Sequence, residues 1–145
     1  MKQKNKKANC ILSFSLTKKE DLQTVMGDFQ KCRETYVINE KVFFDLKLCL
    51  EEAITNIFSH GYKQAQKDIE ISLHLYKTSD GFMADIVDNG NAFNPCSDFN
   101  PTHLEINWKA RPVGGLGIHL LKNLSDELEY IPQQNGNRLK IYKKT

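Results

Sequence analysis

Three polar residues that can do chemistry, Glu52, Asn56 and His60, follow one another at intervals of four in the stretch LEEAITNIFSHGY. On a helix, this spacing stacks the three side chains along one stripe. A carboxylate one turn from an amide oxygen combines a base for a hydroxyl proton with a ligand for a hard cation such as Mg²⁺. Solvated helix positions carry the same residue types, and we interpret His60 as closing a pocket or capping the helix end rather than as catalytic.

A second group of candidates follows an apolar run that ends at Val87, where the chain continues as Asp88-Asn89-Gly90. An aspartate at a strand end, beside a glycine that lets a ligand come close, can accept a hydrogen bond from an exocyclic amine. Phe93 follows shortly afterwards and is a candidate to cover a flat ring. A β-turn is the alternative, because Asp-Asn-Gly is common turn chemistry.

The third candidate is the glycine-rich segment Gly114-Gly115-Leu116-Gly117, which precedes an apolar helical pattern. Glycines expose backbone N–H groups, and a helix N-terminus adds the positive end of the helix dipole, so such a segment can hold a phosphate. A flexible hinge is the alternative interpretation.

These candidates need helices to position them, and apolar residues at helical spacing predict three. The first covers about residues 18–36, with Thr17 as its N-cap. The second covers about residues 40–60, has Asn39 as its N-cap and is anchored through its apolar face. The third begins near Gly115.

Alternation of apolar and polar residues, together with turn residues, predicts strands at residues 10–16, 68–77, 82–87, 127–132 and 138–143. The last four form two antiparallel hairpins around turns at 79–81 and 134–137. Strands outnumber helices, so we expect an α+β fold with one sheet and the helices packed on one face. The roughly thirty residues from 88 to 117 show little periodicity, and a loop this long in a small domain is usually functional.

Composition limits the classes of protein that fit. The chain has 145 residues and a formal charge of +2, and a polar, lysine-rich tail occupies residues 1–9. We therefore expect one domain over residues 10–145 and no nucleic-acid partner. No window approaches the roughly 20 apolar residues of a membrane span. The cysteines show neither zinc nor disulfide spacing, so a reduced cytoplasmic setting is expected.

Four segments together resemble the sequence boxes of GHKL-type ATPases: EAITNIFSHGY the N-box, DNGNAFNP the G1 box, GGLGIHLL with DELEY the G2 box, and NGNRLKI the closing strand. The resemblance covers residues 10–143 and is strongest to the bacterial anti-sigma factor serine/threonine kinases. It implies a two-layer α/β sandwich with a mixed, mostly antiparallel sheet that binds ATP and Mg²⁺ beneath a lid at about residues 96–113. It also implies phosphorylation of a Ser or Thr on an anti-anti-sigma (STAS-like) protein, and binding of that partner or of a sigma factor.

The resemblance assigns a role to each candidate. Glu52 matches the general base, Asn56 the Mg²⁺ ligand, Asp88 the carboxylate that reads adenine, and Gly90 the small residue beside it. The glycine-rich segment matches the phosphate-contacting box, in which Gly114 is the lid hinge and Gly115, Leu116 and Gly117 lead into the helix. These roles agree with the chemistry of phosphoryl transfer, which needs mainly positioning and charge stabilisation.

Three functional hypotheses remain open. An active protein kinase and an ATP-binding regulator that sequesters its partner without phosphoryl transfer share every binding residue. A detached sensor histidine-kinase catalytic domain fits less well, because no phosphoacceptor helix precedes the domain and Glu52 supplies a base that attack by a hydroxyl requires. Arg111, in the expected lid, is either a contact for the γ-phosphate or a solvated charge. We also expect a homodimer through the first strand or the first helix.

Overall fold

The computed structural model describes residues 8–62, 67–95 and 115–145, with side chains described from residue 119 onward in the last range. The expected lid at 96–113 and most of the expected tail lie outside these residues. The described elements, in chain order, are β1 (Asn9–Leu16), α1 (Asp21–Thr35), α2 (Glu40–Asn56), a π-turn η1 (Ile57–Gly61), β2 (Ile71–Thr78), β3 (Gly81–Asp88), α4 (Gly115–Leu124), β4 (Glu127–Gln133) and β5 (Gly136–Lys144).

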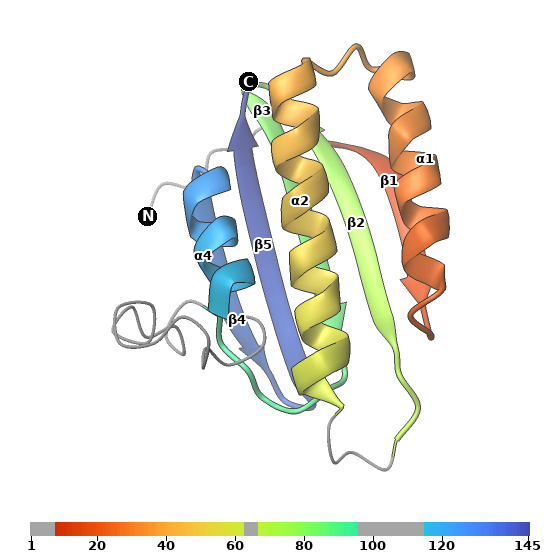
Figure 1. Cartoon of the computed structure of the whole chain (residues 1–145), viewed down its shortest axis with the longest axis vertical. Coiled ribbons are helices and arrows are strands. Elements are labelled where there is room, and N and C mark those ends of the chain that lie inside the picture. The colour runs from red at the N-terminus through yellow and green to blue at the C-terminus, as the bar shows by residue number, and fades with distance from the viewer. Residues whose placement is uncertain (1–7, 63–66, 96–114) are drawn as a thin grey trace.

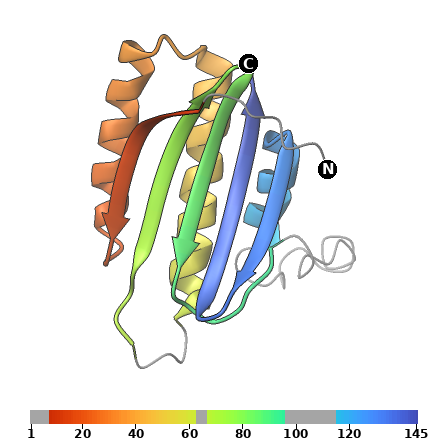
Figure 2. The same cartoon turned by 180° about the vertical axis from the view of Figure 1, so that it is seen from behind.

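The five strands form one sheet in the order β1-β2-β3-β5-β4, and each neighbouring pair is antiparallel. The three α-helices lie on one face of this sheet (Figure 1), and the view from behind shows its other face without a helix (Figure 2). The α+β fold and both predicted hairpins are confirmed. The order also carries new information, because β5 lies between β3 and β4 and so places the end of the chain beside the strand that ends in Asp88.

The helix-covered face of the sheet forms the core. Alternate side chains of the central strands are buried there, among them Leu73, Leu75, Ala84, Ile86, Leu139 and Ile141. α2 lies over the middle of the sheet (Figure 1) and buries Leu46, Leu50 and Ile54, each with 0% of its surface exposed. Burying a leucine or isoleucine side chain contributes about 1.5–3 kcal/mol, so this central helix is firmly held, and the residues at its C-terminal end have a fixed support.

The two predicted helix caps have different outcomes. The Asn39 side chain accepts a hydrogen bond from Lys41 N at 2.9 Å and caps α2, as predicted. The predicted Thr17 cap is wrong, because α1 begins at Asp21 and has Glu20 as its N-cap without a side-chain bond. The hydrogen bonds run the other way: a side chain of the helix, Asp21 Oδ2, accepts from the backbone N–H groups of Thr17 at 2.9 Å and Lys18 at 3.2 Å. An acidic residue in the first turn of α1 thus accepts hydrogen bonds from backbone N–H groups that precede the helix.

A cluster of charges joins α2, α4 and β5. Asp45 on α2 is buried, and its Oδ2 lies 2.8 Å from Lys41 Nζ and 2.9 Å from Lys143 Nζ. Lys143 Nζ also donates to Leu124 O, at the C-terminal end of α4, at 2.8 Å. Burial alone would raise the pKa of Asp45, but the two lysine contacts outweigh it and hold that pKa below its ordinary value. This cluster ties the C-terminal end of α4 to α2 and β5.

Candidate functional site

The organising helix changes its hydrogen-bonding pattern at the residues of interest. The helix predicted for residues 40–60 is present, but its last turn, Ile57–Gly61, is a π-turn that directly follows Asn56. Single π-turns are rare and are found most often at functional sites. In this turn the His60 ring stacks on the ring of Phe93, with centroids 5.0 Å apart and planes inclined by 17°. The helix end is therefore in contact with the loop that follows β3.

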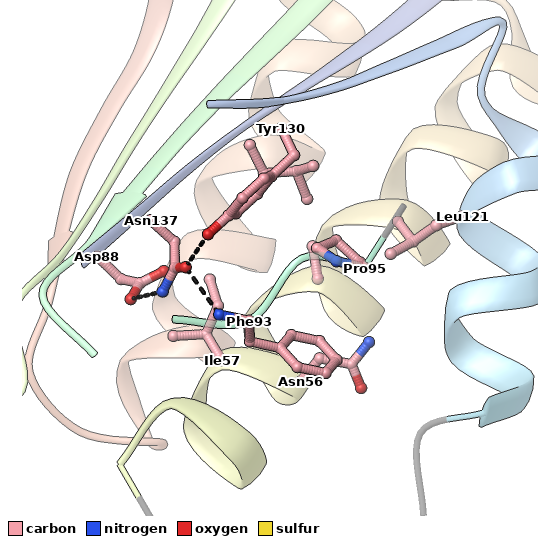
Figure 3. A pocket seen from close by; sticks show the side chains of 10 residues that line it. Asn56, Ile57, Asp88, Phe93, Pro95, Leu121, Tyr130 and Asn137 are labelled. Atoms are coloured by element: carbon pink, nitrogen blue, oxygen red, sulfur yellow. Dashed lines mark hydrogen bonds between the residues drawn. The ribbon is translucent and has the colours of Figure 1, made fainter. Parts of the chain in front are cut away.

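A pocket lies between the end of α2, the end of β3, α4 and the C-terminal hairpin (Figure 3). It is lined by Ala53, Asn56, Ile57, Asp88, Phe93, Pro95, Leu121, Tyr130, Asn137 and Leu139. Its unfilled volume is about 30 Å³, which is room for about two waters. The enclosed part of the pocket is therefore smaller than a flat heterocycle. The lining is mostly apolar with a few polar groups, as in sites for small ligands.

Asp88 is the last residue of β3 and is buried, with 6% of its surface exposed. Its Oδ1 accepts hydrogen bonds from Gly90 N at 2.8 Å and from Asn137 Nδ2 at 3.0 Å. The first of these is an Asx turn, so the turn interpretation and the ligand interpretation of this tripeptide coexist. Burial raises the pKa of Asp88, against the two hydrogen bonds and the charge of Lys67. Within the described residues no hydrogen bond occupies Oδ2, which leaves an acceptor for a ligand.

The loop after Asp88 is fastened to the helix end. Asn91 N donates to Gly61 O at 2.6 Å. A Cβ atom at position 90 would lie only 2.8 Å from Gly61 O, so the close approach of these two backbones requires Gly90. Asn89 fixes the other side, because its Oδ1 accepts from Glu70 N and Tyr62 OH and its Nδ2 donates to Asp68 O. Gly90 is therefore small for a structural reason, whatever ligand lies beside it.

Asn56 points an amide into the pocket without a partner. The residue is 5% exposed and lines the pocket, and its Nδ2 is the one buried side-chain N or O atom of the described residues that has no hydrogen-bond partner. Which end of an amide is nitrogen is assigned rather than seen, so either end can face a ligand. Glu52 lies one turn earlier on α2, is partly exposed, and is outside the set of residues that line the pocket. Of the predicted pair, Asn56 therefore lines the pocket and Glu52 does not.

The glycine-rich segment is described in part. α4 begins at Gly115, as predicted, so Gly115, Leu116 and Gly117 form its first turn. Leu121, further along α4, lines the pocket, so this helix borders the site. Gly114 and Arg111 lie outside the described residues.

Two polar residues of the C-terminal hairpin, Tyr130 and Asn137, line the site, and the sequence analysis did not identify them as site residues. Asn137 is buried and contacts Asp88, Phe93 and Tyr130 (Figure 3). It also donates to the backbone oxygen of Asn91. The sequence placed Asn137 only in a turn, because its position opposite Asp88 depends on β5 pairing with β3. The available signal was the second asparagine of Asn-Gly-Asn, a polar residue that begins a strand whose alternate positions are apolar.

The chain was compared with known proteins. The family model of the histidine kinase-like ATPase domain matches residues 16–143. The chain belongs to this family. Serine-protein kinase RsbW from Bacillus mycoides (strain KBAB4) and from Bacillus anthracis are each 33% identical to it over 88 residues. These matches cover 59% of this chain and 54% of each relative, so the chain spans about half the length of the curated relatives it matches.

A solved structure shows the same fold. The histidine kinase domain from Erythrobacter litoralis EL346 blue-light activated histidine kinase superposes with a TM-score of 0.51 at 14% sequence identity. The match covers 83% of this chain and 59% of that one. The chain is thus a GHKL-type protein, as the sequence boxes predicted, and is similar to the serine-protein kinases RsbW. No helix in the described ranges is long and apolar enough to cross a membrane.

Proposed function

We propose that this chain binds ATP with Mg²⁺ in the pocket and, as a cytoplasmic serine/threonine protein kinase, phosphorylates an anti-anti-sigma partner. The observation that carries the proposal is the buried amide of Asn56, whose Nδ2 has no hydrogen-bond partner among the described residues and which lies in a pocket that also contains Asp88 (Figure 3). An unsatisfied buried polar group costs about 1–3 kcal/mol, so a ligand that pairs with it is favoured there. The names of the RsbW relatives, serine-protein kinases, support the class of acceptor.

The base-binding half of the pocket has the groups that a purine amine needs. Asp88 Oδ2 accepts a hydrogen bond from the exocyclic amine, since Oδ1 is already used twice. Ile57, Phe93 and Leu139 supply apolar surface for the ring. Phe93, which lines the pocket, also stacks on His60 at the end of the helix, so movement of this ring to admit a base would change that contact.

The phosphate-binding half lies between α2 and the start of α4. Asn56 provides an amide oxygen for Mg²⁺, and the first turn of α4, with Gly115 and Gly117, provides backbone N–H groups for phosphate oxygens. Bound Mg²⁺ supplies neutralisation of the charge that develops on the phosphates. Glu52 takes the proton of the attacking Ser or Thr hydroxyl. The oxygen of that hydroxyl bonds to the γ-phosphorus while the bond between the γ-phosphorus and the ADP oxygen breaks. The assignment of Gly114 as the lid hinge follows from the sequence resemblance, since this residue lies outside the described ranges.

A regulator that binds ATP and sequesters a sigma factor without phosphoryl transfer is the second candidate. The observation in its favour is the position of Glu52, which is partly exposed and outside the pocket lining. A homodimer through β1 or α1 belongs to both proposals, because β1 is an edge strand of the sheet with one side available for pairing. Light scattering at high protein concentration tests it, and a monomer would contradict it.

The binding proposal is tested by titrating the protein with Mg-ATP in calorimetry and thermal denaturation. Mass action predicts a stabilisation of about 2.7 kcal/mol at a hundredfold excess over Kd. Asp88→Asn should remove most of this stabilisation, because the acceptor for the amine becomes a neutral amide. Asp28→Asn is the matched control, since Asp28 is a partly exposed residue of α1 that lies outside the pocket lining. Unchanged affinity in Asp88→Asn would exclude the adenine assignment, and no transfer to an anti-anti-sigma protein that is bound would favour the regulator.

A further inference from the structure

The side-chain amide of Asn137 makes four hydrogen bonds to four different parts of the site. Nδ2 donates to Asp88 Oδ1 at 3.0 Å and to Asn91 O at 2.8 Å. Oδ1 accepts from Phe93 N at 2.9 Å and from Tyr130 OH at 2.6 Å. An asparagine side chain has two donor hydrogens and two acceptor lone pairs, so this amide is fully used. With 6% of its surface exposed, Asn137 is also shielded from water.

The partners fix which way the amide points. A flipped amide would set an NH₂ group against the backbone N–H of Phe93 and an oxygen against both the Asp88 carboxylate and the Asn91 carbonyl. The Asp88 carboxylate and the Asn91 carbonyl can only accept, and the Phe93 N–H can only donate. Only the observed orientation of the amide therefore satisfies these three partners. A single rotamer of Asn137 therefore fixes both Asp88 and the loop that follows it.

Two parts of the pocket share this anchor. The bond to Oδ1 and the Gly90 N–H together fix the plane of the Asp88 carboxylate, so that Oδ2 is the oxygen left for a ligand. The bonds to Asn91 O and Phe93 N fix the backbone that presents the Phe93 ring to the pocket. The polar contact and the ring contact of a bound base would thus be set by the same residue.

We propose that Asn137 is a positioning residue for the nucleotide site, which orients Asp88 and the Phe93 backbone without itself touching the ligand. This inference rests on the proposed nucleotide binding. It predicts a specific electrostatic consequence, because the Asn137 donor stabilises the ionised form of a buried carboxylate.

The charged and titratable groups near Asp88 set the background for that consequence. Burial raises the pKa of Asp88, and the Asn137 and Gly90 hydrogen bonds and the charge of Lys67 oppose the rise. Tyr62, whose own pKa is raised by burial and by Asp88, lies on the helix side of the carboxylate. Loss of the Asn137 donor raises the pKa of Asp88 further. Because the amine needs the ionised Oδ2 as acceptor, the acid limb of nucleotide binding moves to higher pH.

The test measures Mg-ADP affinity against pH for the full chain, two Asn137 variants and one control variant. Asn137→Ala removes all four bonds, and Asn137→Thr keeps the volume and one hydroxyl in case the alanine variant folds poorly. Affinity at neutral pH should fall about tenfold or more, the usual effect of a lost hydrogen bond to a charged group. The acid limb of the curve of affinity against pH should shift to higher pH, which a merely structural role of Asn137 would not cause. Asn135→Thr, at an exposed turn position of the same hairpin, should behave as wild type.

A second measurement needs no variant and no ligand. In the wild-type protein, the NMR signals of the Asn137 side-chain NH₂ group should titrate together with the Asp88 carboxyl. The inference would be overturned if the variants fold and keep the wild-type affinity and pH profile. It would also be overturned if the NMR signals of the Asn137 NH₂ group do not change as Asp88 ionises. If the wild-type chain binds no nucleotide, the proposed function fails, and the NMR titration alone then decides the role of Asn137.

Discussion

Replacing Gly90 with alanine tests whether close contact between two backbones holds the site together. A Cβ atom at position 90 would lie 2.8 Å from Gly61 O and 3.0 Å from Asp88 Oδ1. Ordinary carbon–oxygen contacts are about 3.3–3.6 Å, so the loop and the π-turn must separate by roughly half an ångström. The obstructing atom is backbone, so a rotamer change cannot relieve the clash. Gly61 O also accepts from Asn91 N at 2.6 Å, so the same movement lengthens that bond.

We expect Gly90→Ala to lower the free energy of unfolding by about 1–3 kcal/mol, the usual cost of overpacking a buried contact. For a chain of this length that corresponds to a fall in Tm of roughly 3–9 °C. Nucleotide affinity should fall as well, because the displaced loop carries the donor that fixes Asp88 Oδ1. Urea and thermal unfolding followed by circular dichroism measure the first effect, and calorimetric titration with Mg-ADP the second.

Gly27→Ala is the matched control, because a Cβ atom at this position in α1 meets nothing within 4 Å. An alanine inside a helix should stabilise it by about 0.5–1 kcal/mol relative to glycine. The two alanine substitutions should therefore change stability in opposite directions. If Gly90→Ala is as stable as the wild type, or gains as Gly27→Ala does, the explanation of the loop by its contact with Gly61 is refuted.

Three further changes probe other parts of the structure. Glu52→Gln should leave nucleotide affinity unchanged but slow transfer to an anti-anti-sigma protein by about 10²–10⁴-fold, and a wild-type transfer rate would remove its role as base. Asn56→Ala should weaken the Mg²⁺ dependence of nucleotide binding, measured by calorimetry with and without Mg²⁺, whereas an unchanged dependence would point to another ligand. Despite its burial, Asp45 has a lowered pKa because of Lys41 and Lys143, so its contribution to stability is present above the unfolded pKa and is lost as pH falls through the folded pKa. Lys143→Met should thus cost more stability at pH 7 than in acid by urea unfolding, and an equal cost at both would contradict the ion-pair account.

Local patterns predicted most of the elements of this fold. The hairpin of β2 and β3 follows from alternation over eight-residue strands around a short turn. α2 follows from its apolar spacing and the Asn39 cap, and the start of α4 from the glycines before an apolar run. Each of these signals lies within a few residues of the structure that it specifies, so tertiary context was not needed.

The features that the sequence did not reveal depend on contacts between distant segments. The π-turn at Ile57–Gly61 is stabilised by Asn91, which lies beyond two strands of the chain. At the start of α1, the Thr17 hydroxyl donates to Asp21 Oδ2 instead of accepting from the helix, and the residue spacing alone does not decide which of the two side chains accepts. The ligand-binding and catalytic roles of all the candidate residues, from Glu52 and Asn56 to the glycine-rich segment and Arg111, stay predictions.

The strand order explains why the candidate site is a property of the whole sheet. Asp88 and Asn137 are 49 residues apart in the chain, and they meet because β5 inserts between β3 and β4 instead of following β4 at the edge. A chain that ended before β4 could still form the β2–β3 hairpin and α2, but Asp88 Oδ1 would lose its side-chain donor and the Phe93 backbone its acceptor. Non-local strand pairing forms late and costs loop-closure entropy. The pocket is therefore complete only when the C-terminal hairpin has docked, which would couple the proposed ligand binding to the completeness of the fold.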